Sequence, residues 1–286
     1  MRRKDFIGPF ARALQTKLYS NFGEIDPLFL AQTVHDAFSQ KHVQVYVRDP
    51  RVAAVLDELD WDGSLETPDQ GDMLMVVDTE VGYSKANALM EKSLTYEVSL
   101  NDDGSGTANL TLGYEHTGSA TNQECTQIVR YNEVRSYDEL VQRCFWNYLR
   151  LYVPTGSRLQ DSTDHQVTAD AFAFSEGWRG SAQTQEMGKN YTVFSNFLIV
   201  PVGQAVTSSY RYTLPRLVIG NEQKHYRLQI LKQAGQKAID LEVRVTLPPG
   251  SVLVEATPAF ETDGQSLVFR GKLAQDMALS LTYRPQ

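Results

Sequence analysis

The sequence has few cysteines and histidines, no long apolar run and no excess of positive charge. Its two cysteines and five scattered histidines show no zinc-ligand spacing. No window reaches the roughly 18 apolar residues of a membrane-spanning helix. The 27 lysines and arginines against 35 aspartates and glutamates give a net charge of -8, with no basic run to offset it. This balance argues against a nucleic-acid partner and is typical of an acidic globular chain.

Familiar catalytic motifs are also missing. Neither the phosphate-binding spacing GxxxxGK(S/T) nor the nucleophile elbow GxSxG occurs. Paired carboxylates for glycoside hydrolysis come from different strands, so spacing alone does not assign them. The sequence therefore predicts no catalytic residue, no metal site and no cofactor.

The two cysteines, Cys125 and Cys144, lie 19 positions apart and flank one polar insertion. Two interpretations are open: two unrelated buried thiols, or one disulfide that closes this segment. A closed loop of that size stabilises a fold by about 3 kcal/mol through the lost entropy of the unfolded chain. A lone pair around one insertion favours the bond, and the bond places the chain in an oxidising compartment outside the cytoplasm.

The first 90 residues have the pattern of a mixed α/β part. Residues 6–22 repeat apolar side chains at helical spacing, which predicts a helix. Asp26-Pro27 and Asp49-Pro50 each join an N-cap to a proline at the first helical position, which predicts two more helices. Residues 43–47 alternate like a strand, and the apolar run 72–78 predicts a buried strand.

From about residue 92 the sequence is typical of β structure. Strand candidates follow at intervals of roughly 10–15 residues with Pro and Gly between them, as in a β-sandwich. The segment 101–106, NDDGSG, carries the Asp-Gly of a hairpin turn. The segments 149–159 and 243–253 match at Arg, Pro, Gly, Ser and Leu, and each predicts a strand that ends at proline and turns through Gly-Ser.

These patterns predict an α+β fold that is mostly β. We expect a mixed helix and strand part at residues 1–90, followed by two β-sandwich-like (Ig-like) modules. The first module spans 91–201 and contains the Cys-bounded insertion, and the second spans 202–286.

The densest polar cluster lies in residues 71–90. Asp72 and Asp78 are six positions apart on one predicted strand, so they face the same side of it. Lys85 and Asn87 follow the end of that strand. Together they form a candidate site for a cation or polar ligand. In the structural alternative, Asp78 caps the turn, Lys85 pairs with a neighbouring carboxylate and Asn87 satisfies backbone groups.

Aromatic side chains alternate along 146–152. Alternation places Trp146, Tyr148 and Tyr152 on one face of a strand, together with Arg150, and the leucines between them on the other face. Sugar-binding sandwiches use aromatic faces of this kind. Core packing and a tyrosine-lined sheet surface are the alternative explanations.

Four segments carry a family resemblance: KHVQVYVRDP with WDGSL, GDMLMVVDTEVGYSKAN, CFWNYLRLYVPTGSRL and YRLQILKQAG. They resemble a bacterial family catalogued only as a domain of unknown function, DUF-4012, over about residues 41 to 235. Asp78, Lys85 and Asn87 match the most specific stretch. This sequence has Glu80 where Asn is typical of the family's DTNVG.

The resemblance implies an envelope protein with an N-terminal membrane anchor and an extracytoplasmic body, with no established activity. It also implies that residue 1 is not a natural start and that an anchor precedes it. We therefore expect an extracytoplasmic cell-envelope protein that binds or scaffolds a surface polysaccharide or another surface protein. The alternatives are an enzyme of cell-surface polymer metabolism, built on Asp72, Asp78, Lys85 and Asn87, and a spacer that holds a distal domain away from the membrane.

Overall fold

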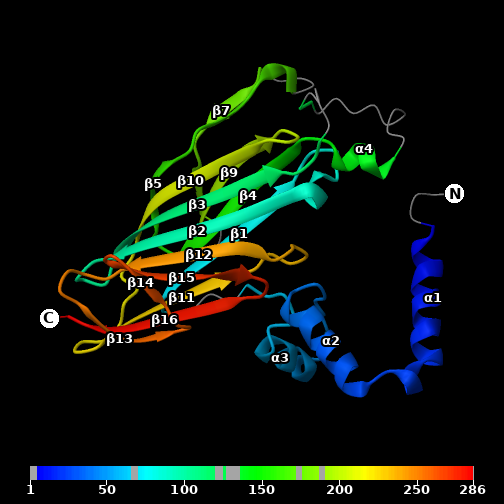
Figure 1. Ribbon diagram of the computed structural model, residues 1–286, viewed down its shortest axis with the longest axis horizontal. Helices are drawn as coiled ribbons and strands as arrows, with labels where there is room; N and C mark the ends of the chain where they lie inside the picture. The colour runs from blue at the N-terminus through cyan, green and yellow to red at the C-terminus, as the bar shows by residue number, and fades with distance from the viewer. Residues whose placement is uncertain are drawn as a thin grey trace. The chain divides into compact units, whose positions relative to one another are not determined.

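The computed structural model describes residues 5–65, 70–119, 125–126, 136–171, 176–186 and 191–285. The chain divides into two compact units, Met1–Ser64 and Leu65–Gln286. The expected fold class is confirmed: the three longest helices lie in the first unit, and two seven-stranded sheets form the second (Figure 1). Within the described residues, no helix combines the length and the apolar character needed to cross a bilayer.

The first unit contains the three helices that the sequence predicts. They are α1 (Ile7–Ser20), expected from apolar spacing, and α2 (Pro27–Ser39) and α3 (Pro50–Glu58), expected from the capping pattern. The Asp26 carboxylate accepts the Leu28 N–H at 2.8 Å, and the Asp49 carboxylate accepts the Arg51 N–H at 2.9 Å. Both aspartates therefore satisfy a backbone donor that the first helical turn leaves open, as an N-cap does.

The expected strand at residues 43–47 is wrong. This segment forms no β-ladder, and its Val45 N–H donates a single bond to the Trp61 carbonyl at 3.1 Å. Alternation predicts which faces a segment presents, but a strand also needs a partner, and the described part of this unit contains no other strand.

The second unit is a β-sandwich. One sheet, here the β1 sheet, has the order β13-β16-β11-β1-β4-β9-β8, and the other, the β2 sheet, has the order β14-β15-β12-β2-β3-β10-β5. The β1 sheet contains β1 (Asp72–Glu80), β4 (Phe145–Pro154), β8 (Gln183–Glu186), β9 (Tyr191–Val200), β11 (Lys224–Leu231), β13 (Val252–Thr257) and β16 (Met277–Arg284). The β2 sheet contains β2 (Met90–Leu100), β3 (Gly106–His116), β5 (Arg158–Ser162), β10 (Ala205–Leu214), β12 (Ile239–Thr246), β14 (Glu261–Asp263) and β15 (Ser266–Leu273).

Smaller elements complete the unit: the helix α4 (Tyr137–Val141), the 3-10 helices Ala86–Leu89 and Ala169–Ala171, and a hairpin of β6 (His165–Val167) and β7 (Trp178–Gly180). Alternate residues of both sheets point inward and form one core. On β3, for example, Ala108, Leu110, Leu112 and Tyr114 are buried. The predicted hairpin turn, NDDGSG, joins β2 to β3.

Two parallel pairs divide the sandwich into halves. β1 pairs with β11 and β2 with β12 in parallel, and the other neighbours in both sheets are antiparallel. Strands up to β10 form one half and strands from β11 onward form the other, and Figure 1 shows the two halves side by side. This division differs from the expected boundaries at residues 90 and 201, because β1 and β10 both pair within the first half. The halves share both sheets and one core.

The two matching sequence segments each carry the chain from one sheet to the other, in opposite directions. In 149–159 the chain leaves β4 and enters β5 of the opposite sheet, and in 243–253 it leaves β12 and enters β13 of the opposite sheet. In both turns the serine N–H donates to the proline carbonyl at 3.1 Å. Gly156 and Gly250 have φ of +88° and +79°, a conformation that glycine adopts at no steric cost.

Candidate functional site

The inner face of β1 carries two carboxylates, Asp72 and Asp78, at its two ends. Both side chains point between the sheets, as the spacing of six predicts. At a rise of about 3.3 Å per residue, the six steps separate the two residues by roughly 20 Å. They therefore belong to two different clusters.

Asp72 lies in a cluster of tyrosines and is 1% exposed. Its Oδ2 accepts the Tyr226 hydroxyl at 2.6 Å and the Tyr96 hydroxyl at 2.8 Å, and the Tyr212 hydroxyl donates to the Tyr96 oxygen at 3.2 Å. Burial raises the pKa of Asp72 to about 6, against the smaller, opposite effect of the two hydroxyl donors. Among the described residues no cation pairs with Asp72, and desolvation dominates.

Asp78 lies in a cluster that contains a cation. Its Oδ2 accepts Lys92 Nζ at 2.8 Å and Gln236 Nε2 at 3.2 Å, and its Oδ1 accepts the Tyr114 hydroxyl at 2.7 Å and Asn147 Nδ2 at 2.6 Å. Burial alone would raise the pKa of Asp78, but the Lys92 ammonium and these hydrogen bonds together hold it below its ordinary value. Asp78 is thus an ionised carboxylate with four side-chain donors.

The four residues singled out from the sequence do not converge in one pocket. Asn87 is exposed and its Oδ1 accepts Lys92 Nζ at 3.2 Å, so Lys92 joins it to Asp78. Lys85 has an exposed side chain, and its backbone N–H bonds the Leu140 carbonyl. The structure therefore brings Asp78 and Asn87 together and leaves Asp72 and Lys85 apart from them.

The sequence reasoning missed Lys92, together with Tyr114, Asn147 and Gln236. A signal was present, because Lys92 occupies an inward position of β2, between the buried Met90 and Leu94. A lysine at such a position needs a partner, since an unpaired buried charge is costly. The cavity beside the cluster has a volume of about 20 Å³, which is room for about one water molecule.

A larger cavity, of about 820 Å³, opens on the outer face of the β1 sheet. Its size falls within the range of about 300–1,000 Å³ typical of small-ligand sites. Its lining combines polar and apolar side chains. The polar ones come from β11, β13 and β16 and are His225, Arg227, Gln229, Thr257 and Ser280; the apolar ones are Leu217, Ile219 and Ala278. We call this the outer cavity. It is roomier than the cavity beside Asp78, and of its residues only Asp72 was a sequence-based candidate.

The aromatic residues of β4 face outward on the same sheet, opposite the fully buried leucines between them. Trp146 is only 3% exposed because it packs against Phe197, with ring centroids 5.9 Å apart. Tyr148 and Tyr152 are half-buried: the Tyr148 oxygen accepts Gln185 Nε2 at 3.0 Å, and the Tyr152 ring lies 5.2 Å from that of Tyr191. The candidate aromatic surface therefore reduces to the two tyrosines.

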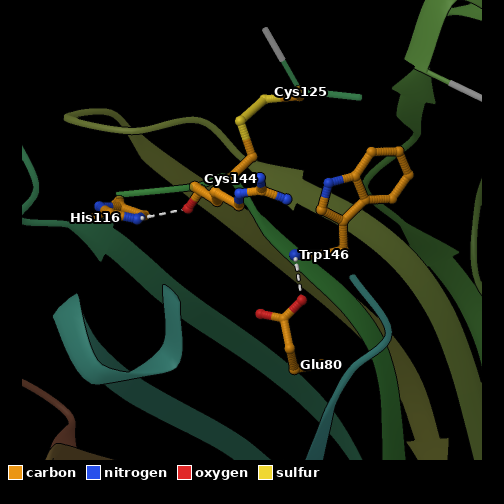
Figure 2. The surroundings of a disulfide bond; sticks show 6 residues. Glu80, His116, Cys125, Cys144 and Trp146 are labelled. Atoms are coloured by element: carbon orange, nitrogen blue, oxygen red, sulfur yellow. Dashed lines mark hydrogen bonds between the residues drawn. A yellow bond between two sulfur atoms is a disulfide. The ribbon is translucent and has the colours of Figure 1, made fainter. Parts of the chain in front are cut away.

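The expected disulfide is confirmed. Cys125 and Cys144 are bonded, with their Cα atoms 5.4 Å apart, and Figure 2 shows the bond above the start of β4. Both cysteines contact a small apolar cluster on the outer face of the β1 sheet that includes Trp146. The bond ties Cys125, at the N-terminal end of the insertion, to Cys144, directly before β4. Within the described residues no cysteine is free.

Two titratable side chains support the backbone beside this disulfide (Figure 2). His116 Nδ1 accepts the Gly118 N–H at 3.0 Å, so its Nε2 carries the proton and donates to the Arg143 carbonyl at 3.0 Å. Glu80 Oε1 accepts the N–H of Gly82 and of Trp146, at 2.9 and 3.3 Å. Burial raises the pKa of Glu80 to about 7. Among the described residues, no three His, Cys, Asp or Glu side chains gather as a metal site.

Comparisons with known proteins find only distant structural similarities. No protein-family model matches the sequence, and a search of curated proteins finds no match. Among solved structures, a "putative nutrient binding protein" of Legionella pneumophila is 11% identical with a TM-score of 0.46, over 77% of this chain and 73% of that one. An M1 zinc metallopeptidase of Deinococcus radiodurans is 10% identical with a TM-score of 0.32, over 77% of this chain and 43% of the peptidase. At these identities and TM-scores, neither likeness carries a functional conclusion.

Proposed function

We propose that this protein is an extracytoplasmic binding protein of the cell envelope, and that it holds a segment of surface polysaccharide in the outer cavity. The observation that carries the proposal is the cavity itself: about 820 Å³, open to solvent and lined by polar and apolar side chains together. A purely structural spacer needs no such cavity.

The chemistry of the lining suits a carbohydrate. Gln229 supplies an amide, Arg227 a guanidinium and Ser280 a hydroxyl, which together donate and accept hydrogen bonds. Leu217 and Ile219 add apolar surface for the C–H faces of a sugar ring. In ligand pockets, a small number of convergent polar groups on an otherwise apolar wall fixes the orientation of the ligand.

The disulfide supports the proposed compartment. Disulfides persist in oxidising compartments and are rare in the cytosol of most organisms. The resemblance of four sequence segments to the DUF-4012 envelope family agrees with this placement.

The enzymatic alternative has less support. It required Asp72, Asp78, Lys85 and Asn87 to share one pocket, and only Asp78 and Asn87 lie together. Asp78 already accepts four side-chain donors, and the cavity beside it is about 20 Å³. A carboxylate so enclosed has no room beside it for a substrate.

A binding experiment with matched arginine variants tests the proposal. The Arg227→Ala/Gln229→Ala double variant removes two groups of the outer cavity, and Arg211→Ala removes an exposed arginine from mid-strand β10 on the opposite sheet. On a glycan array and in pull-downs from envelope extracts, we expect binding by the unmodified chain. We expect about a tenfold or greater loss in the double variant, from the lost hydrogen bonds, and none in Arg211→Ala.

Two outcomes would contradict the proposal. The first is an empty array together with an empty pull-down. The second is equal binding by the double variant and the Arg211→Ala control, which would place the ligand elsewhere on the surface.

A further inference from the structure

At one end of the sandwich, an amine and a carboxamide both donate to a single carboxylate. Lys92 comes from β2, Asn147 from β4 and Asp78 from β1. Lys92 Nζ donates to Asp78 Oδ2 at 2.8 Å, and Asn147 Nδ2 donates to Asp78 Oδ1 at 2.6 Å. Because β2 and β4 belong to opposite sheets, the carboxylate bridges an amine from one sheet and a carboxamide from the other.

The carboxamide of Asn147 is held at both of its polar atoms. Its Nδ2 donates to Asp78, and its Oδ1 accepts the Thr79 N–H at 3.1 Å. The residue is fully buried. A fixed backbone N–H on a carbonyl oxygen stabilises the negative charge that develops there when the carbonyl carbon is attacked.

Lys92 donates to the second oxygen of the carboxylate that Asn147 contacts. Its side chain is 8% exposed, and its Nζ lies 5.3 Å from the ring centroid of Phe145 and 5.9 Å from that of Tyr114. The neutral amine is the nucleophilic form, so Lys92 must lose a proton before it can attack a carbonyl carbon. The adjacent Asp78 oxygen can accept the proton that the amine must lose.

We propose that Lys92 and Asn147 become joined by an intramolecular isopeptide bond, with Asp78 as the proton-transfer group. A proton passes from Lys92 Nζ to Asp78 Oδ2, and the Nζ lone pair attacks the Asn147 Cγ. The bond from Cγ to Nδ2 then breaks as Asp78 returns its proton to Nδ2, which leaves as ammonia. The second proton lost from Nζ converts the ammonia to ammonium, so charge and atoms balance without an oxidant or other co-reactant.

The bond would tie the two sheets together close to the disulfide. Asn147 lies three positions after Cys144, so β4 would carry two covalent links near its start. The disulfide fixes the insertion to the β1 sheet, whereas the isopeptide bond would fix the β1 sheet to the β2 sheet. A cross-link that no reductant breaks would hold the sandwich closed at this end.

Mass spectrometry of the intact, reduced chain tests the proposal directly. Loss of ammonia lowers the mass by about 17 Da relative to the sequence mass. Trypsin does not cleave after an amidated lysine, so digestion should yield peptide 86–130 joined to peptide 144–150. The digest must follow reduction and alkylation, because the Cys125–Cys144 disulfide joins the same two peptides.

Two variants serve as matched controls. Lys92→Arg keeps the positive charge but removes the attacking amine, and we expect it to show the full sequence mass. Asn87→Ala removes the other asparagine whose side chain contacts Lys92, at 3.2 Å, and we expect it to keep the loss of about 17 Da.

Three results would overturn the assignment. A full sequence mass for the unmodified chain means that no bond forms. A cross-link contained within peptide 86–130 means that Asn87 is the acceptor. A loss of about 18 Da, which is water, means that Lys92 has joined a carboxylate such as Asp78.

Discussion

The two aspartates of β1 differ in pKa although they share a strand, a face and near-complete burial. The pKa of Asp72, whose side-chain donors among the described residues are two tyrosine hydroxyls, rises to about 6. That of Asp78, beside Lys92, falls below its ordinary value. Hydrogen bonds from neutral groups offset part of the cost of burying a carboxylate, and here a cation offsets the rest.

The proposed isopeptide bond would alter this comparison, because it consumes the ammonium of Lys92. Asp78 would then resemble Asp72, with hydrogen bonds and no cation. The effects of the charge are therefore measured in variants at position 92 that cannot form the bond.

Exchange of Lys92 for an uncharged residue should have the largest effect. Lys92→Met and Lys92→Arg both lack the isopeptide bond, but Lys92→Met also leaves Asp78 buried without a cation. We expect Lys92→Met to be less stable than Lys92→Arg by about 3–5 kcal/mol at pH 7, measured by urea unfolding. The same pair of changes at Lys272, whose ion pair with Asp240 is exposed, is the control and should differ little. Similar differences at the two positions would show that Asp78 does not depend on its cation.

The sequence predicts local features of this molecule well. The caps at Asp26 and Asp49, the strand at 72–78 and the alternation around Trp146 follow from neighbours a few positions away, and the structure contains them. The disulfide follows from a different argument, since two cysteines allow one pairing.

The partners of Asp78 could not be predicted in this way. Asn147 lies 69 positions from Asp78, and Gln236 lies 158 positions away. Gln236 follows β11, which lies beside β1 only because the two halves join through a parallel pair. Spacing says which residues share a face of one strand, but the order of strands in the sheets decides which residues meet between them. The same holds for the outer cavity, whose lining comes from several strands and loops.

A change at the other aspartate should alter the pH dependence of stability. The pKa of Asp72 is about 6 in the folded chain and 3.8 in its ordinary state, so the folded chain binds the proton more tightly. The contribution of Asp72 to the free energy of unfolding is therefore largest below about pH 4. It falls as the pH rises to about 6 and stays low at higher pH. Asp72→Asn mimics the protonated form and removes this loss.

We expect the stability of Asp72→Asn, relative to the unmodified chain, to increase by about 2 kcal/mol between pH 4 and pH 7. The whole pKa shift corresponds to about 3 kcal/mol, and part of that loss has already occurred at pH 4. Urea unfolding at several pH values measures it. Glu80, with a pKa of about 7, contributes a loss of the same sign in both proteins and cancels in the difference. Parallel stability curves for the two proteins would show that the pKa of Asp72 is not raised.

The smallest expected effect concerns one hydroxyl in each cluster. Tyr114 donates to Asp78 and Tyr226 to Asp72, at 2.7 and 2.6 Å. At pH 5 Asp78 is ionised and Asp72 is protonated, and hydrogen bonds to charged groups contribute about 1.5–3 kcal/mol against about 1 kcal/mol for neutral pairs. In the Lys92→Arg background, Tyr114→Phe should therefore cost more stability at pH 5 than Tyr226→Phe, by about 1 kcal/mol.

This difference should disappear as the pH rises. At pH 7.5 Asp72 has lost its proton, so the Tyr226 hydroxyl then also donates to a charged carboxylate and its removal costs more. The cost of Tyr114→Phe stays constant, because Asp78 is ionised at both pH values. Urea unfolding of both variants at pH 5 and 7.5 measures the change. If Tyr114→Phe and Tyr226→Phe lower the stability equally at pH 5, the two carboxylates have the same charge state at that pH. The cation beside Asp78 would then not be the cause of a pKa difference between them.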